Sequence, residues 1–420
     1  MFVGIADTFT VSFASEAEVS GVSLVSSFNT VLIFLFTVLS SGGAVIISQY
    51  IGSRRNDLAS RASGQLLMLS SLLSAVLTAL ILLFQSPLLK LLFGRIETDV
   101  MTACRTYLFI TTLSLPFLAV YDAGVALCRS IGKTNVTMYI SIAANVINVA
   151  DNCIGVFLLH MGAAGVAYPS LLSRILSAIA VTAYCFRREN PVHYKLSDIF
   201  CQDGALLKKI MHIALPNGVE NGVHQLVKVA LFSMVALFGT YQIAANGVAQ
   251  SIWSLAAIMG LAMAPVYTTV IGQYMGAKDI DAANFYFQKL NRITLLLSIL
   301  WNALIFALTP LIVRYSAISL EAKELVLWLV LINNIFNGLA YPFAGSLGSG
   351  LRAAGDVKFT MIVSIVLTIA ARLLFSALFG LWLNWGVIGV AIGMSMDLVF
   401  RGGIFLWRYR SQKWTKFQLI

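Results

Sequence analysis

The segment Ile47-Ser48-Gln49-Tyr50-Ile51-Gly52 returns 224 positions later as Ile271-Gly272-Gln273-Tyr274-Met275-Gly276. An aspartate and an alanine follow each copy at matched spacing: Asp57 and Ala59, then Asp281 and Ala283. Two more blocks repeat in the same order. Arg129-x-x-Gly132 recurs 223 positions on as Arg352-x-x-Gly355, and Gly162-x-x-Gly165 recurs 224 positions on as Gly386-x-x-Gly389. Three blocks in one order at nearly one offset predict two homologous halves.

The composition places both halves in a membrane. The chain is 59% hydrophobic and 11% charged over 420 residues, whereas soluble domains carry roughly 25% charged residues. Apolar stretches of about 20 residues recur, and each is long enough to cross a hydrocarbon core of about 30 Å. The five cysteines and four histidines have no metal-ligand spacing, so we expect buried cysteines and no metal site.

Twelve apolar windows predict an all-α polytopic membrane protein with 12 transmembrane helices, the first one incomplete. We expect two six-helix lobes related by a pseudo-two-fold axis along the membrane normal. The predicted parts are an N-terminal lobe, a cytoplasmic linker, a C-terminal lobe and a cytoplasmic tail, at 1–187, 188–207, 208–410 and 411–420. The windows lie at about 1–13, 28–50, 64–88, 105–127, 136–160, 164–186, 211–239, 243–272, 290–315, 324–347, 358–383 and 387–407.

The basic residues predict the orientation. Of the 28 Lys and Arg residues, 19 fall in the segments after the even-numbered windows and 5 in the opposite segments. Positive residues accumulate on the cytoplasmic side, so we expect both termini to be cytoplasmic. The net charge of +10 is therefore a topology signal rather than a nucleic-acid footprint.

Five acidic residues fall inside apolar windows: Asp7, Asp122, Asp151, Glu220 and Asp397. A charge at the centre of a membrane helix costs at least about 2.5–3.5 kcal/mol, so each one needs a partner or a function. Asp7 aligns with Ser233 in the second half, so this carboxylate occurs in one half only. It is a candidate to carry a proton or sodium ion; the alternative is a structural hydrogen-bond anchor.

Polar residues crowd the fifth window at Asn145, Asn148, Asp151 and Asn152. With an offset of 223 positions between the halves, the counterparts of the last three in the second half are apolar. Ala371 corresponds to Asn148, Leu374 to Asp151 and Phe375 to Asn152. The first half therefore carries a polar patch that belongs either to a cation-coupling site or to contacts between helices.

The seventh window carries Glu220, His224 and Lys228 at four-residue spacing, with Asn217 and Asn221 beside Glu220. This stripe lines a substrate cavity or forms an internal scaffold of charge pairs. A second polar face, suited to a binding wall for flat cations, holds Asn333, Asn334, Asn337 and Tyr341. We interpret Arg372, Asp397 and Arg401 as structural charge pairs, since Asp397 and Arg401 are four residues apart.

No catalytic constellation emerges from the sequence. There is no complete Gly-x-x-x-x-Gly-Lys-Ser/Thr phosphate loop, because Leu127 stands where the motif before Gly132-Lys133-Thr134 needs a glycine; this argues against an ATP-driven pump. No nucleophile, base and oxyanion site can be assembled either. A membrane-embedded enzyme is therefore disfavoured, and no cofactor is expected.

The chain resembles the multidrug and toxic compound extrusion (MATE) family, in particular its bacterial branch. The resemblance rests on Asp7, Gly42-Gly43, Gln49-Tyr50-x-Gly52, Arg129-x-x-Gly132-Lys133-Thr134, Pro216-x-x-x-Glu220-Asn221, Gln273-Tyr274-x-Gly276-Ala277, Arg352-Ala-Ala-Gly355-Asp356, Arg372, Met396-Asp397-x-x-x-Arg401 and Trp414. It implies export of organic cations or drugs in exchange for H⁺ or Na⁺, by a monomer in the bacterial inner membrane. A flippase for lipid-linked precursors, of the same broad superfamily, is the alternative.

The resemblance also implies a coupling site in the first lobe. The family's first-helix carboxylate falls on Asp7, and its Asn…Asp pair falls on Asn148 and Asn152. The second acidic position is thus Asn here, so either Asp151 substitutes for it or Asp7 acts alone. Only six residues precede Asp7, and we expect this chain to be truncated at its N-terminus.

Overall fold

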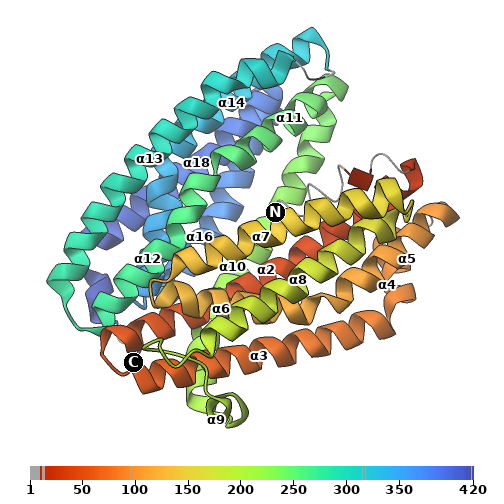
Figure 1. The fold of residues 1–420 in the computed structure, drawn as a ribbon. Coiled ribbons are helices and arrows are strands. Elements are labelled where there is room, and N and C mark those ends of the chain that lie inside the picture. Colours follow the sequence, from red (N-terminus) through yellow and green to blue (C-terminus); the bar gives the residue numbers. More distant parts are fainter. Residues whose placement is uncertain (1–9, 12–14, 95, 315, 317, 418) are drawn as a thin grey trace. The chain divides into compact units, whose positions relative to one another are not determined.

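The computed structural model describes the whole chain except residues 1–9, 12–14, 95, 315, 317 and 418. The described residues form helices and connecting turns and contain no strand. They separate into two compact units, which we describe one at a time (Figure 1). Unit 1 comprises residues 1–51 and 55–214, and unit 2 comprises residues 52–54 and 215–420.

Unit 1 contains the first group of helices. They are α2 (Glu16–Gly52), α3 (Asn56–Leu83), α4 (Gln85–Phe93), α5 (Thr98–Leu113), α6 (Leu115–Ser130), α7 (Thr134–Cys153), η1 (Ile154–Leu158), α8 (Ala163–Cys185), α9 (Leu196–Phe200) and the start of α10 (Gly204–Val235). Helix α8 packs on α5, α6 and α7, and α6 packs on α3. The apolar core between them includes Val22, Phe36, Leu108, Leu115 and Val166.

Unit 2 continues from the middle of α10. It holds η2 (Ala236–Phe238), α11 (Thr240–Ala256), α12 (Ile258–Gly276), α13 (Ile280–Arg314), α14 (Leu320–Tyr341), η3 (Pro342–Ser346), α15 (Leu347–Ala353), α16 (Val357–Leu367), η4 (Thr368–Leu373), α17 (Leu374–Ala377), η5 (Leu378–Trp382), α18 (Gly386–Arg410) and η6 (Lys413–Lys416). Helix α14 packs on α11, α13 and α18.

Eleven of the twelve predicted windows coincide with helices that are candidate membrane spans. Ten described helical stretches are long and apolar enough to cross a membrane, and the bent pair α5–α6 makes an eleventh. That pair bends by 42° where Pro116 enters the first turn of α6, since proline cannot continue the hydrogen bonding of the preceding helix. The remaining window, the first along the chain at 1–13, lies mostly outside the described residues.

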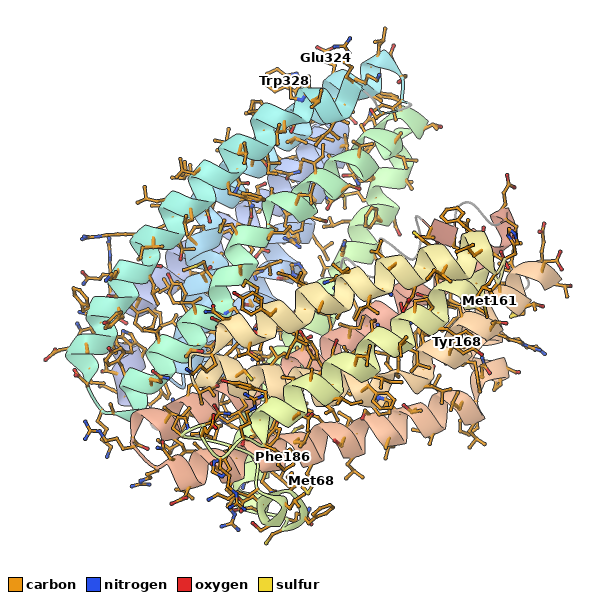
Figure 2. The ribbon with its side chains drawn as sticks, viewed as in Figure 1. Met68, Met161, Tyr168, Phe186, Glu324 and Trp328 are labelled. Carbon is orange, nitrogen blue, oxygen red and sulfur yellow. The ribbon has the colours of Figure 1, made fainter. Side chains whose placement is uncertain are left out.

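Apolar side chains point outward along these helices, as lipid contact requires. On α3, Leu72, Val76, Leu80 and Leu83 recur at three- or four-residue spacing and are all exposed, so they form one apolar stripe. In Figure 2, Glu324 and Trp328 project outward at the start of α14, one turn apart. Tryptophan beside a charge is typical of the boundary between lipid and water.

The interval 187–203 belongs to unit 1 and packs on α3. Gln65 Nε2 of α3 donates to the carbonyl oxygens of Asp198 and Cys201, at 2.6 and 2.7 Å, and Gln65 Oε1 accepts from the Asp203 amide. Tyr194 packs edge-on against Phe186, and burial raises the pKa of its phenol well above the usual range. The boundary between the units falls further along, between Ala214 and Leu215 in α10.

The internal repeat appears in the backbone. The non-glycine residues Arg54 and His160 have φ values of 59° and 50°, and the residues 224 positions on, Lys278 and Asn384, have 59° and 54°. The π-helical turns η1 and η5 also begin 224 positions apart. Left-handed φ is uncommon outside glycine, so its recurrence at matched positions supports the two homologous halves.

One extra residue separates the halves between their second and third repeated blocks. The offset is 223 at Gly132 and Gly355 and becomes 224 at η1 and η5. Between these points, unit 2 has a π-helical segment, η4, whereas the matching part of α7 is α-helical. A π-helical turn holds one residue more than the α-helical turn it replaces, so η4 accommodates the insertion.

This insertion corrects the predicted counterparts in the fifth window. Residues beyond η4 correspond at 224 positions, so Asp151 matches Phe375 and Asn152 matches Ser376. The assignments to Leu374 and Phe375 are wrong by one residue. Asn152 and Ser376 are both fully buried, so a polar side chain occupies this position in both halves.

Gly393 lets α18 approach α17 closely. A methyl group there would overlap the backbone nitrogen of Ser376, whereas one at Gly403 on the same helix would meet no atom within 4 Å. We expect Gly393→Ala to cost about 1–3 kcal/mol through overpacking. Gly403→Ala is expected to be neutral or to stabilise by up to about 1 kcal/mol, because alanine is the better helix former. Thermal unfolding of the two purified variants tests this, and equal midpoints would contradict it.

Candidate functional site

The predicted coupling residues of α7 differ in burial. Asn148 and Asn152 are fully buried, whereas Asn145 and Asp151 are partly buried. Asn145 donates to the carbonyl oxygen of Ser141 on its own helix, at 2.8 Å. Asp7, the predicted coupling carboxylate, lies outside the described residues. The structure thus places two amides inside unit 1, with Asp151 at the edge of the same face.

Asn148 connects α7 to α8. Its Nδ2 atom donates to Ser170 Oγ at 3.2 Å, while its Oδ1 atom accepts no hydrogen bond from any described residue. A buried amide oxygen without a donor costs free energy unless water, a proton or a cation satisfies it. Asn148 therefore offers a neutral oxygen ligand inside unit 1.

More buried polar groups lie in unit 1 than the sequence analysis selected. Asn29 Nδ2 of α2 donates to Thr111 Oγ1 at 3.0 Å, and Arg174 Nη1 of α8 donates to Ser114 Oγ at 2.6 Å. Asn29, Thr111 and Ser114 are buried. All four residues lie inside the predicted apolar windows 28–50, 105–127 and 164–186. A polar side chain within such a window was the signal that could have identified them.

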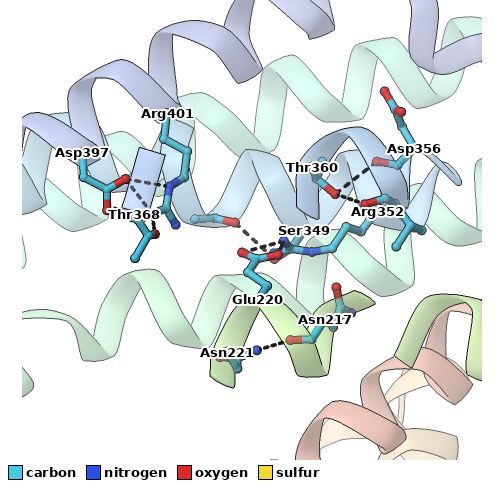
Figure 3. Close-up of polar contacts among 12 residues, drawn as sticks. Asn217, Glu220, Asn221, Ser349, Arg352, Asp356, Thr360, Thr368, Asp397 and Arg401 are labelled. Atoms are coloured by element: carbon cyan, nitrogen blue, oxygen red, sulfur yellow. Dashed lines mark hydrogen bonds and ion pairs between the residues drawn. The ribbon is translucent and has the colours of Figure 1, made fainter. Parts of the chain in front are cut away.

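In unit 2, the stripe on α10 makes an ion pair and hydrogen bonds within the unit (Figure 3). Glu220 pairs with Arg352 of α15 at 3.1 Å, with side chains 16% and 18% exposed. His224 Nε2 lies 3.0 Å from Arg372 Nη1. A guanidinium can only donate, so Nε2 must be the accepting nitrogen of a neutral ring. Asn221 donates to the carbonyl oxygen of Asn217, and both Asn221 and Lys228 are exposed.

Arg372, Asp397 and Arg401 form one buried cluster. Arg401 Nη2 donates to both oxygens of Asp397 at 2.6 Å and also to Thr368 Oγ1 at 2.7 Å. Arg372 Nε lies 3.3 Å from Asp397 Oδ2, but this contact lacks hydrogen-bond geometry. Two guanidinium groups thus share one carboxylate whose side chain is 0% exposed, leaving a net positive charge inside unit 2.

The asparagines of α14 bond inside unit 2. Asn334 Nδ2 donates to the carbonyl oxygen of Asn302 on α13, and Asn337 Nδ2 donates to Asn302 Oδ1, both at 3.1 Å. Asn333 is partly buried, and the ring of Tyr341 lies against Gly260 and Gly345. An open apolar groove of about 300 Å³ lies on α14, η3 and α18. Its lining residues include none of the predicted cavity residues.

These features define a class of protein. Two compact helical units with homologous sequences, each with charged and amide side chains inside its membrane spans, are typical of secondary transporters. Within the described part of the chain, no three His, Cys, Asp or Glu side chains come together as possible metal ligands.

Comparison with known proteins identifies the family. The MatE family model matches residues 1–154 and 216–378, so the chain belongs to the MatE family. The uncharacterized transporter YisQ of Bacillus subtilis (strain 168) is 26% identical over 99% of this chain and 91% of its own. The probable multidrug resistance protein NorM of Thermotoga maritima is 23% identical over 99% and 89%. The resemblance to the MATE family is confirmed.

Solved structures confirm the fold. A structure described as MATE in the bent conformation aligns with a TM-score of 0.90 at 21% identity, over 99% of this chain and 92% of that one. A second is described as an outward-facing multidrug resistance MATE family transporter of the MOP superfamily. It aligns with a TM-score of 0.89 at 21% identity, over 99% and 95%. The all-α polytopic fold is thereby established.

Proposed function

We propose that this protein is a secondary active antiporter. It exports organic cations or amphipathic drugs in exchange for H⁺ or Na⁺ by alternating access. The observation that carries the proposal is the MatE match across both halves, together with relatives named as probable multidrug resistance proteins. We propose that the protein acts as a monomer in the bacterial inner membrane, with both termini cytoplasmic. The bias of basic residues supports that orientation.

The coupling ion is proposed to bind in unit 1, at Asp7 with Asn148, Asp151 and Asn152. The Asn148 oxygen that lacks a donor supports this assignment, as does the burial of Asn152 beside it on α7. An ion that binds one conformation more tightly than the other shifts the equilibrium between them, and that difference couples ion flow to export.

The proposed substrate contacts lie in unit 2. Asn221 and Lys228 are exposed on α10 and could meet a ligand as they stand. Glu220 and His224 already bond to Arg352 and Arg372, so substrate would have to displace an arginine from each. Asn333, Asn334, Asn337 and Tyr341 are the proposed wall on α14, where Asn334 and Asn337 each keep an amide oxygen without a donor among the described residues.

Reconstituted vesicles test the function. With an imposed H⁺ or Na⁺ gradient, the wild-type protein should move a fluorescent organic cation against its own gradient. Asp7→Asn should lower ion-driven transport at least tenfold, because an amide carries no exchangeable charge. Asp99→Asn, at an exposed position on α5, is the matched control and should transport normally. Full ion-driven transport by Asp7→Asn would refute the role of Asp7. If neither an H⁺ nor a Na⁺ gradient drives transport by the wild-type protein, antiport is refuted.

A further inference from the structure

Asp122 is an acidic residue of unit 1 to which the proposed coupling site gives no role. It lies in the middle of α6, seven residues or about 10 Å along the helix from Arg129. Thr37 Oγ1 of α2 lies 3.4 Å from Asp122 Oδ2 and 3.0 Å from the carbonyl oxygen of Ile33, so these two acceptors share its one proton. Asp122 is partly buried and Thr37 is exposed on unit 1. The carboxylate thus sits inside a membrane span, at the edge of the unit's packed interior.

Asp122 has no close counter-ion among the described residues. The carboxylates that pair with a basic nitrogen within 4.0 Å are those of Asp57, Asp203, Glu220, Asp356 and Asp397. The charged groups that act on Asp122 over longer distances are Arg129 on its own helix and Arg174 on α8. A carboxylate held this way in a span is costly when charged, so it will readily bind a proton.

The helices packed around α6 bring few other titratable groups. Tyr121 is adjacent on α6 itself and is influenced by the Asp122 charge. Helix α3 has no charged residue between Arg61 and Leu83, and α2 has none after Glu18. Helix α7 carries Tyr139 and Asp151, α8 carries Arg174 with Tyr168 and Tyr184, and α5 carries Asp99, Arg105 and Tyr107. Asp122 is therefore the one acidic residue in the middle of α6 and its described neighbours α2 and α3.

Thr37 belongs to a row of hydroxyl side chains on α2. At 100° per residue, the row falls within about 40° of one line along the helix, and it consists of Ser23, Ser27, Thr30, Thr37 and Ser41. Ser27, Thr30 and Thr37 are exposed on unit 1, and each donates to a backbone carbonyl oxygen one turn earlier. Their remaining hydrogen-bonding capacity has no partner in hydrocarbon, so this face suits water better than lipid.

We propose that Asp122 is a second proton-carrying carboxylate of unit 1, loaded and unloaded along the hydroxyl row of α2 during antiport. The carboxylate takes a proton from hydronium, which leaves a neutral carboxylic acid and water, and the reverse step returns it. A sodium ion would need several oxygen ligands, whereas Asp122 has the single hydroxyl of Thr37 beside it. The proposal rests on the antiport function proposed above and adds a residue to it.

Proton release on substrate binding tests the proposal. Purified protein in weakly buffered detergent solution is titrated with the transported organic cation, and the protons released per protein are counted with a pH-sensitive dye. Asp122→Asn should release one proton fewer than the wild type, whereas Asp122→Glu should release the wild-type number. Asp99→Asn is the control for the loss of an exposed carboxylate.

Thr37→Val gives an independent readout. The Thr37 hydroxyl stabilises the charged carboxylate, so its loss favours the protonated form. The midpoint of proton release should therefore move to higher pH while the number of protons stays unchanged. This shift decides the question even if Asp122→Asn does not yield folded protein, and an unmoved midpoint would count against the proposal.

The outcomes separate the two levels of inference. If wild-type transport follows neither gradient, the antiport function itself fails. If the wild type couples to H⁺ but Asp122→Asn releases the full number of protons, only the Asp122 assignment fails. If the wild type couples to Na⁺ and releases no proton, antiport stands and the proton role of Asp122 is overturned.

Discussion

Replacing Asp397 with Asn is expected to lower the stability of the purified protein by about 3–5 kcal/mol, the usual cost of removing one partner from a buried ion pair. The side chain of Asp397 is 0% exposed and lies between Arg401, at 2.6 Å, and Arg372, at 3.3 Å. An amide in its place would leave two guanidinium groups in a span without a counter-charge. The midpoint of thermal unfolding in detergent is the measurement, and it should fall well below the wild-type value.

Two further variants test the electrostatic cause. Asp397→Asn combined with Arg401→Gln restores the net charge of the cluster and should recover part of the lost stability. Asp57→Asn removes a carboxylate that is 97% exposed and pairs with Lys195 at the surface. It should leave the midpoint almost unchanged, since exposed pairs contribute little. A midpoint for Asp397→Asn equal to that of Asp57→Asn would show that the arginines do not depend on the carboxylate.

Deleting Ile369 is expected to leave a folded protein, although a deletion inside a membrane helix is normally disruptive. Ile369 is half-exposed and lies in η4, where unit 2 carries one residue more than unit 1. Its removal converts the π-helical turn to the α-helical form of the other half. The residues on both sides then keep their faces, and Arg372 stays near Asp397.

Deleting Leu296 from α13 is the matched control. Leu296 is also exposed, but the surrounding helix is α-helical over Ile280–Arg314. The loss of one residue rotates the rest of that helix by about 100°, which would turn the buried Asn302 and Thr309 away from their partners. Size-exclusion chromatography should give a monodisperse peak for the Ile369 deletion and aggregate for the Leu296 deletion. If both deletions aggregated, η4 would not be the site of the insertion.

The fold was predictable from the sequence to a large extent. Spans are set by the length and apolarity of local stretches, so eleven windows could be placed before any packing was known. The repeat likewise needs only local identity, and positions such as His160 and Asn384 confirm it in the backbone. The counterparts of Asp151 and Asn152 were misplaced because an inserted residue leaves no mark in a sequence until a π-helical turn shows where it lies.

The sequence predicted which residues belong to the candidate site, but it did not predict which side chains they contact. A polar residue inside an apolar window can be recognised from the sequence as a candidate site residue, as Asn148, Glu220 and Arg372 were. Spacing along one helix does not say which side chain of another helix lies opposite. The stripe on α10 could be interpreted as cavity lining or as charge pairs, and the structure shows Glu220 bonded to Arg352 and His224 bonded to Arg372.

The sequence by itself determined that this chain is a membrane protein of two homologous helical halves, because hydrophobicity and repetition are properties of the chain taken in order. Tertiary structure decided which buried polar groups are already satisfied. In unit 2, Asp397 forms ion pairs with two arginines. In unit 1, among the described residues, the Asn148 oxygen has no donor and the hydrogen-bond partner of Asp122 is the hydroxyl of Thr37. Those differences depend on contacts between helices far apart in the chain, and sequence order does not specify such contacts.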